Sequence, residues 1–196
     1  AVGIAMPWIY PTPAGMFLFA GIAGFCYGVY TSVDQALNVD VLPNGGRVLF
    51  VRNIANVTMD LDDVESIDFR ALGGADNIVV GDLTGTDLTQ AGLDLRGPNG
   101  GGDSAADAVT VNGSNNDDAF GASGDAGGVN VFGLKAAVTI FSPERANDRL
   151  TLNALGGDDV VNATALEADG IQLTVNGGLG EDIFLKPVRK GTPTYR

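Results

Sequence analysis

The stretch from Arg149 to Lys186, RLTLNALGGDDVVNATALEADGIQLTVNGGLGEDIFLK, twice runs an alternating apolar strand through a glycine-rich acidic turn into another apolar strand. The second turn and its strand, Gly177 to Leu185, fit the nonapeptide pattern G-G-x-G-x-D-x-U-x at every fixed position. Glycines let the backbone turn with its carbonyls pointing inward, the aspartate adds a carboxylate, and an apolar residue fills the core between turns. Such a turn offers hard oxygen ligands, which suit calcium.

An internal repeat extends upstream of this stretch. Segments that start at Ser66, Asp107 and Asp148 read SIDFRALGGADNIVV, DAVTVNGSNNDDAFG and DRLTLNALGGDDVVN, at intervals of 41 residues. Further short alternating runs flank them, at residues 57–61, 92–96, 138–141 and 171–175. The runs are too short for helices and are bounded by Gly, Asp and Asn, which predicts short strands joined by turns.

Units of this size cannot each bury an apolar face alone, so we expect them to stack. The predicted fold is all-β, a parallel β-helix (β-solenoid) over residues 44–186, and the alternative is an antiparallel β-sandwich, because strand spacing does not distinguish the two. Insertions at residues 81–90 and 123–134 are predicted to be loops on one face of the stack. The expected inward-facing residues, or their immediate neighbours, are Ile67, Phe69, Val109, Val111, Leu150, Leu152, Ile183 and Leu185.

The composition excludes several functional classes. The 196 residues carry a net charge of −13, which would repel nucleic acid and anionic lipid headgroups and makes divalent cations the natural partners. The chain has no histidine, so it lacks Ser-His-Asp and Cys-His catalysis and histidine-ligated zinc. Cys26 is the only cysteine, so no intrachain disulfide exists.

The composition changes sharply near residue 43. Residues 1–33 contain no charged side chain, and Ala14 to Val33 is a mostly apolar run of 20 residues, long enough to span about 30 Å of hydrocarbon. We therefore divide the chain into an apolar helical segment (1–43), a β-domain (44–186) and a basic tail (187–196). The first segment is predicted to be a transmembrane helix, with a signal-peptide-like segment or a helix that caps the β-domain as alternatives.

The first segment also resembles a known family. Residues 7–43, and most specifically Ser32 to Pro43 (SVDQALNVDVLP), look like a late transmembrane helix and loop of bacterial major facilitator superfamily sugar transporters. A transporter needs many more spans around a central site, so a single piece does not inherit transport. The joining of such a fragment to the β-domain can itself be artificial.

The β-domain resembles bacterial secreted calcium-binding proteins of the RTX, or hemolysin-type repeat, class. The resemblance covers residues 44–185 and rests on NGGRVLFVRNIANVTMDLDDVESIDFRALGGADNIVV, ANDRLTLNALGGDDVVNATAL and IQLTVNGGLGEDIF. It implies that calcium lies between successive coils. The implied ligands are the Asp182 carboxylate and the carbonyls of Gly178 and Gly180; the further candidates are Asp159, Asp158 and Asp76.

Two departures from the family pattern qualify the calcium prediction. The chain has one full nonapeptide, and Asp159 and Asp182 are 23 residues apart, whereas a stacked pair of nonapeptides is about 18 long. The turns that contain Asp76 and Asp158 lack the middle glycine. The alternative interpretation of these acidic turns is structural, with the aspartate accepting a hydrogen bond from a nearby backbone N–H.

Three functions agree with these features. The first is a non-enzymatic, calcium-binding module outside a bacterial cell or on its surface, structural or adhesive, with cell-surface polysaccharide or self-association as further partners. The second is a polysaccharide lyase-like enzyme, for which Arg145 and Arg149 are the available basic residues. The third is a structural protein tethered to the membrane through residues 14–33.

Overall fold

The computed structural model describes residues 35–41 and 45–186. They contain fourteen strands and one short 3-10 helix, so the prediction of an all-β fold is confirmed for this part of the chain. The strands are β1 (Gln35–Val41), β2 (Val48–Arg52), β3 (Val57–Leu61), β4 (Ser66–Arg70), β5 (Asp76–Val80), β6 (Gln90–Asp94), β7 (Ala108–Asn112), β8 (Ala119–Asp125), β9 (Gly128–Phe132), β10 (Ala137–Phe141), β11 (Arg149–Asn153), β12 (Val160–Leu166), β13 (Gln172–Asn176) and β14 (Ile183–Leu185); the 3-10 helix η1 is Ile54–Asn56.

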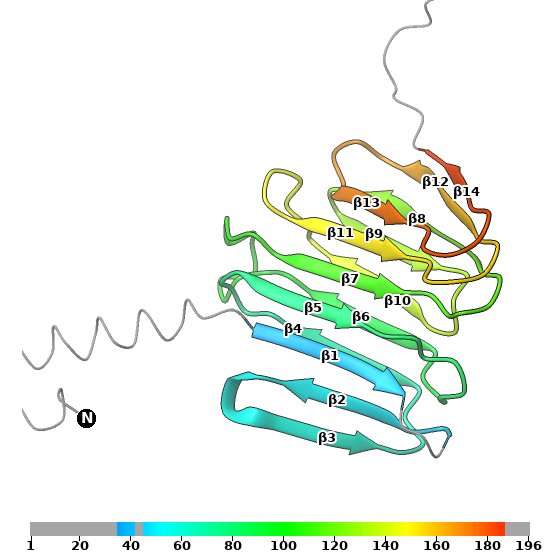
Figure 1. The fold of residues 1–196 in the computed structure, drawn as a ribbon. Helices are drawn as coiled ribbons and strands as arrows, with labels where there is room; N and C mark the ends of the chain where they lie inside the picture. The colour runs from blue at the N-terminus through cyan, green and yellow to red at the C-terminus, as the bar shows by residue number, and fades with distance from the viewer. Residues whose placement is uncertain (1–34, 42–44, 187–196) are drawn as a thin grey trace, which may run out of the picture. The chain divides into compact units, whose positions relative to one another are not determined.

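The strands form two seven-stranded sheets (Figure 1). Sheet I has the order β13-β11-β7-β5-β1-β2-β3, and sheet II has the order β14-β12-β8-β9-β10-β6-β4. Eight of the twelve strand pairings are parallel; the antiparallel ones are β1 with β2, β2 with β3, β8 with β9, and β9 with β10. This pairing differs from that of an antiparallel sandwich, in which strands adjacent in sequence pair with each other.

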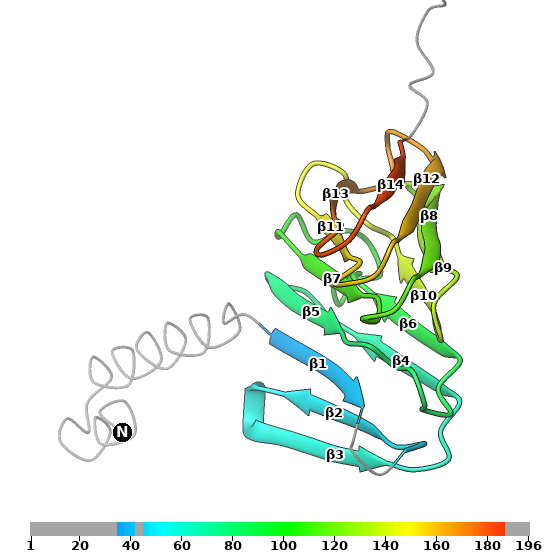
Figure 2. The same ribbon diagram turned by 45° about the vertical axis from the view of Figure 1, so that its right-hand side comes forward.

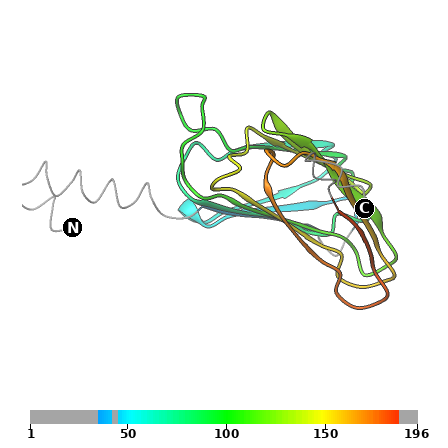
Figure 3. The same ribbon diagram turned by 90° about the horizontal axis from the view of Figure 1, so that it is seen from above.

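From β4 onward the chain passes repeatedly from one sheet to the other. It alternates β4 (sheet II), β5 (sheet I), β6 (sheet II), β7 (sheet I) and β8 (sheet II), and after the β8–β10 meander it continues through β11, β12, β13 and β14. We call each pair of successive strands in different sheets a coil. The sheets lie opposite each other (Figure 2), and seen from above the strands of successive coils overlie one another (Figure 3).

The core lies between the sheets and consists of apolar residues in register. In sheet I, Leu150 pairs with Val109 and Val109 pairs with Ile78, and all three side chains are buried. Leu152 and Val111 repeat this arrangement two residues later. The prediction that Val109, Val111, Leu150 and Leu152 form inward ladders is therefore confirmed, and the alternation of the sequence follows from the alternation of side chains along a strand.

One part of the predicted ladders is wrong. Ile67 and Phe69 belong to β4 in sheet II, where Ile67 pairs with Ala91, so they do not stack on Val109. In β14 the inward position is Phe184, an immediate neighbour that the prediction allowed: it pairs with the buried Val161, and the side chains of Ile183 and Leu185 are 57% and 43% exposed. A period of two assigns a residue to a face, but it does not assign a strand to one of two sheets.

The two predicted insertions are not equivalent loops. Residues 81–90 connect β5 in sheet I to the start of β6 in sheet II and bury Leu83 and Leu88. Residues 123–134 include the end of β8, a turn and β9, so they add an antiparallel hairpin within sheet II. The prediction of a loop is therefore wrong for residues 123–134.

The start of the β-domain also differs from the expected boundary. The compact unit that holds the strands begins at Gln35, and β1 pairs with both β2 and β5. Residues 35–41 therefore belong to this unit. The predicted membrane segment at residues 14–33 and the basic tail at 187–196 lie outside the described residues. Within the described ranges, we find no helix with the length and apolarity needed to cross a membrane.

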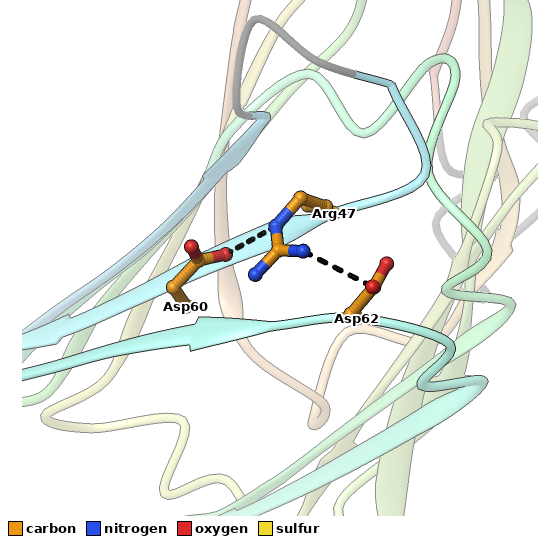
Figure 4. A network of polar contacts seen from close by, with 3 residues as sticks. All are labelled: Arg47, Asp60 and Asp62. Atoms are coloured by element: carbon orange, nitrogen blue, oxygen red, sulfur yellow. Dashed lines mark hydrogen bonds and ion pairs between the residues drawn. The ribbon is translucent and has the colours of Figure 1, made fainter.

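An ion-pair network lies beside the β2–β3 hairpin at the edge of sheet I (Figure 4). The Nε atom of Arg47 donates to Oδ1 of Asp60 at 2.8 Å, and its Nη1 atom donates to Oδ2 of Asp62 at 3.0 Å. These side chains are substantially exposed, so the network contributes little to stability. Its effect is local, because the one positive charge of Arg47 offsets part of the negative charge of two aspartates beside the outermost strand of the sheet.

Candidate functional site

Polar side chains at the corners of the coils form four ladders that run along the stacking direction. Each ladder takes one residue from each of three coils. The sheet I aspartate ladder is Asp76, Asp107 and Asp148; the sheet II aspartate ladder is Asp118, Asp159 and Asp182; the outer acidic ladder is Asp117, Asp158 and Glu181; the asparagine ladder is Asn112, Asn153 and Asn176. These ladders hold all the aspartates that the sequence singled out as metal ligands.

The sheet I aspartate ladder lies where strands of sheet I begin. Oδ1 of Asp107 accepts a hydrogen bond from the backbone N–H of Asp76 at 2.9 Å, and Oδ1 of Asp148 accepts one from the N–H of Asp107 at 3.1 Å. Oδ2 of Asp148 also accepts the N–H of Glu144 at 2.6 Å. All three aspartates are 3% exposed or less. The carboxylates of Asp107 and Asp148 thus supply acceptors to backbone N–H groups at the start of sheet I strands.

Burial changes the acidity of this ladder. It raises the pKa of Asp107 to about 7; the hydrogen bond from Asp76 acts in the opposite direction, and the neighbouring carboxylate of Asp148 adds to the rise. Burial likewise raises the pKa of Asp148, which Glu144 and Asp103 raise further. Desolvation and like charge both favour the neutral acid, and with a pKa of about 7 Asp107 is only partly ionised at neutral pH.

The sheet II aspartate ladder lies at the opposite corner, where strands of sheet II begin. The N–H of Asp118 donates to Oδ1 of Asp159 at 2.7 Å, and the N–H of Asp159 donates to Oδ1 of Asp182 at 3.1 Å. Asp159 is fully buried, and its Oδ2 atom has no hydrogen-bond partner among the described residues. Burial, reinforced by the charges of Asp118, Asp182 and Asp117, raises the pKa of Asp159.

The outer acidic ladder is exposed, and its bonds run in the reverse direction. The N–H of Asp158 donates to Oδ1 of Asp117, and the N–H of Glu181 donates to Oδ1 of Asp158, both at 2.9 Å. The paired aspartates Asp158 and Asp159 therefore separate onto different ladders, one in solvent and one in the core. Neighbouring side chains on an extended chain point to opposite sides, so the pair cannot act as an acid and base on one substrate atom.

The asparagine ladder lies at the ends of sheet I strands. Nδ2 of Asn153 donates to Oδ1 of Asn112 at 2.9 Å, and Nδ2 of Asn176 donates to Oδ1 of Asn153 at 2.8 Å. An amide side chain offers both a donor and an acceptor, so a column of asparagines can repeat the same bond from coil to coil. The sequence analysis did not single out these residues, although their intervals of 41 and 23 match those of the aspartates.

The glycines of the nonapeptide allow its turn to stack on the turn of the preceding coil. A Cβ atom on Gly180, where φ is +130°, would collide with the carbonyl oxygen of Gly157. A Cβ atom on Gly178 would collide in the same way with the carbonyl oxygen of Leu155. Both glycines are therefore required by close backbone packing between coils, whether or not their carbonyls bind a metal.

Substitution of Gly180 with alanine tests this packing. We expect Gly180→Ala to lower the free energy of unfolding by about 2 kcal/mol, because it combines a positive φ with a backbone collision. The matched control is Gly85→Ala, at φ +86° with no atom near the added Cβ, for which we expect about 1 kcal/mol. Chemical denaturation followed by circular dichroism measures both; equal losses would show that coil packing at Gly180 is loose.

The predicted calcium ligands are brought to the corners of the coils, but each has another role there. Asp182 and Asp159 accept backbone N–H bonds in one aspartate ladder, Asp158 lies in the outer acidic ladder, and Asp76 lies at the opposite corner. In the ranges that the structure describes, no group of three or more acidic or cysteine side chains is arranged to hold a metal ion. The buried Oδ2 atom of Asp159, which has no hydrogen-bond partner among the described residues, is an oxygen that fits a missing ligand.

Comparisons of the chain with protein-family models, with curated proteins and with solved structures found no match.

Proposed function

We propose that this chain is a non-enzymatic β-solenoid (parallel β-helix) module that serves a structural or adhesive role outside a bacterial cell. The observation that carries the proposal is the residue-by-residue register of β7, β11 and β13 in sheet I, together with β8, β12 and β14 in sheet II. Chains built this way gain stability from contacts between neighbouring coils and present long, regular side surfaces for binding. The resemblance to secreted repeat proteins agrees with this role.

The hydrogen bonds at the corners of the coils favour a structural role over a catalytic one. The carboxylates of Asp107 and Asp148 are buried against backbone N–H groups, so they cannot approach a substrate. Arg145, one of two basic residues considered for a lyase, donates from Nε to the carbonyl oxygen of Ala168 at 3.0 Å. A lyase needs a free base beside the sugar ring, and these groups are engaged in holding the coils together.

Two assays on the full chain test this proposal. We expect retention of the protein on bacterial cell-surface polysaccharides in a glycan-binding assay, with no release of reducing ends or unsaturated products from the same polysaccharides. Turnover of any of them would support the lyase alternative. Absence of both turnover and binding would remove the adhesive role.

Calcium binding at the sheet II aspartate ladder is the second candidate. It is favoured by three stacked carboxylates, one of which has an Oδ2 atom without a partner in the described part of the chain. Carboxylate oxygen is a preferred ligand of calcium. The ligands that the resemblance implies are Asp182, Gly178 and Gly180, with Asp159 next to them; when bound, the ion would offset the repulsion among these carboxylates.

Thermal denaturation tests the calcium proposal. A ligand that binds only the folded state at a hundredfold excess over its Kd adds about 2.7 kcal/mol, so we expect a higher Tm in millimolar calcium than in chelator. The Asp182→Asn variant should lose this shift, whereas Asp117→Asn in the outer acidic ladder should keep it. Sodium chloride at equal ionic strength controls for screening; an unchanged Tm in calcium removes the proposal.

A further inference from the structure

Among the described residues, no further strand covers either end of the stack of coils, and both ends expose apolar side chains. β13 and β14 are the last strands of sheets I and II at one end, and β3 and β4 are the last strands at the other. At the β13–β14 end, Leu179 and Ile183 are 81% and 57% exposed, and at the β3–β4 end Met59 is 41% exposed. Outermost strands with apolar side chains are surfaces onto which another chain can add.

A groove between the two sheets opens at each end. The groove at the β13–β14 end has a volume of about 550 Å³ and is lined by Leu173, Val175 and Phe184 among others. The groove at the β3–β4 end has a volume of about 400 Å³ and is lined by Val57, Met59 and Ile67 among others. Each groove is lined by residues at inward-facing positions. In the middle of the stack a further coil covers these positions and they form the core, whereas at the ends no described coil covers them.

Strand direction makes the two ends compatible. In sheet I, β13, β11, β7, β5 and β1 are parallel, and β3 regains their direction because two antiparallel pairings separate it from β1. In sheet II, two antiparallel pairings through β9 give β10, β6 and β4 the direction of β8, β12 and β14. A second copy translated along the stack would therefore present parallel strands to both sheets at once.

The register of sheet I matches the side chains as well. Followed from strand to strand, Leu173 in β13 aligns with Val57 in β3, and Val175 aligns with Met59. These four residues line the two grooves. A translated copy therefore places apolar inward residues opposite apolar inward residues, as happens between coils within the stack.

We propose that the β13–β14 end of one copy binds the β3–β4 end of another, so that copies of this chain assemble head to tail. A dimer that joins two β13–β14 ends would pair β13 of one copy with β13 of the other and leave the β3–β4 grooves exposed. Head-to-tail addition covers a β13–β14 groove and a β3–β4 groove at each contact. Arg47 lowers the negative charge at this contact, because its single positive charge offsets part of the charge of Asp60 and Asp62. The inference deepens the self-association considered for the proposed module and rests on its stacked coils.

The test uses full-length chains with one end blocked. Ile183→Lys with Leu185→Lys blocks the β13–β14 end, and Thr58→Lys with Met59→Lys blocks the β3–β4 end, because edge lysines prevent strand addition. All four side chains are exposed, so the fold should persist, and circular dichroism and Tm verify it. The control is Phe132→Lys with Phe141→Lys, which places the same charges on exposed residues of interior strands of sheet II.

Native mass spectrometry and sedimentation velocity give the outcomes. We expect oligomers for the wild type and the control, monomers for each blocked variant alone, and a discrete heterodimer when the two blocked variants are mixed, one of them isotopically labelled. Both variants keep residues 1–34, so association through that segment would not depend on mixing. A monomeric wild type, or a mixture with no more dimer than its components, overturns the inference and leaves glycan binding and turnover to decide the proposed function separately.

Discussion

Replacement of Asp148 with alanine is expected to lower the free energy of unfolding by about 4 kcal/mol. Its Oδ1 and Oδ2 atoms accept the backbone N–H groups of Asp107 and Glu144, at 3.1 and 2.6 Å, and the residue is 1% exposed. A buried donor that loses its acceptor costs about 1–3 kcal/mol. This substitution leaves one buried donor, the N–H of Asp107, and one partly buried donor, the N–H of Glu144. Urea denaturation at constant pH measures the change from the shift of the midpoint.

Two further variants separate the causes of this loss. Asp148→Asn keeps an acceptor oxygen and removes the buried charge, so we expect it to retain much of the stability that Asp148→Ala loses. Asp158→Ala removes one acceptor from the exposed outer acidic ladder, where water replaces it, and should cost less than about 1 kcal/mol. Equal losses of unfolding free energy in Asp148→Ala and Asp158→Ala would mean that burial of the sheet I aspartate ladder does not increase the cost of removing an acceptor.

The stacking interval was readable from the sequence because two of the aligned segments are true neighbours. Segments from Asp107 and Asp148 repeat at 41 residues, and the structure pairs β7 with β11 and β8 with β12 at that interval, apart from a shift after Asn162. The nonapeptide pattern also placed its apolar position at Phe184, which faces Val161. These features are local and periodic, so an alignment of the chain with itself reveals them.

The segment from Ser66 aligns equally well by pattern, but its strands occupy the sheets in the reverse order, with β4 in sheet II and β5 in sheet I. Its alternation is that of any half-buried strand, and the β9–β10 meander adds two strands to sheet II between coils. Neither the sheet that receives a strand nor an extra antiparallel hairpin changes the period-two signal. Spatial order along the stack therefore could not be obtained from strand spacing.

At the candidate site the sequence pattern predicted the composition of the turn, whereas the packing of the coils determines which groups its oxygens contact. Glycine and aspartate at residues 177–182 predicted a tight, oxygen-rich corner, and the corner exists. The sequence could not show that the carboxylate of Asp182 lies against the N–H of Asp159, because this depends on the register of two coils 23 residues apart. Buried N–H groups must find acceptors, so they compete with a metal for the same oxygens.

The stability of the domain is expected to fall as pH rises from about 4 to about 7. Burial raises the pKa of Asp107 from 3.8 to about 7, so between these values the folded chain binds a proton that the unfolded chain has released. Stability therefore decreases with pH in this window and levels off above it. At 1.36 kcal/mol for each pKa unit, the decrease reaches about 4 kcal/mol. Urea denaturation across this pH range measures it.

The Asp107→Asn variant isolates this effect. Asparagine keeps an oxygen for the N–H of Asp76 but cannot titrate, so the difference in unfolding free energy between wild type and variant should follow a single titration across the window. Asp148 and Asp159 also have raised pKa values and remain in both proteins, so part of the decline should persist in the variant. Parallel curves would show that Asp107 ionises normally in the folded chain, which requires water or a cation to reach the sheet I aspartate ladder.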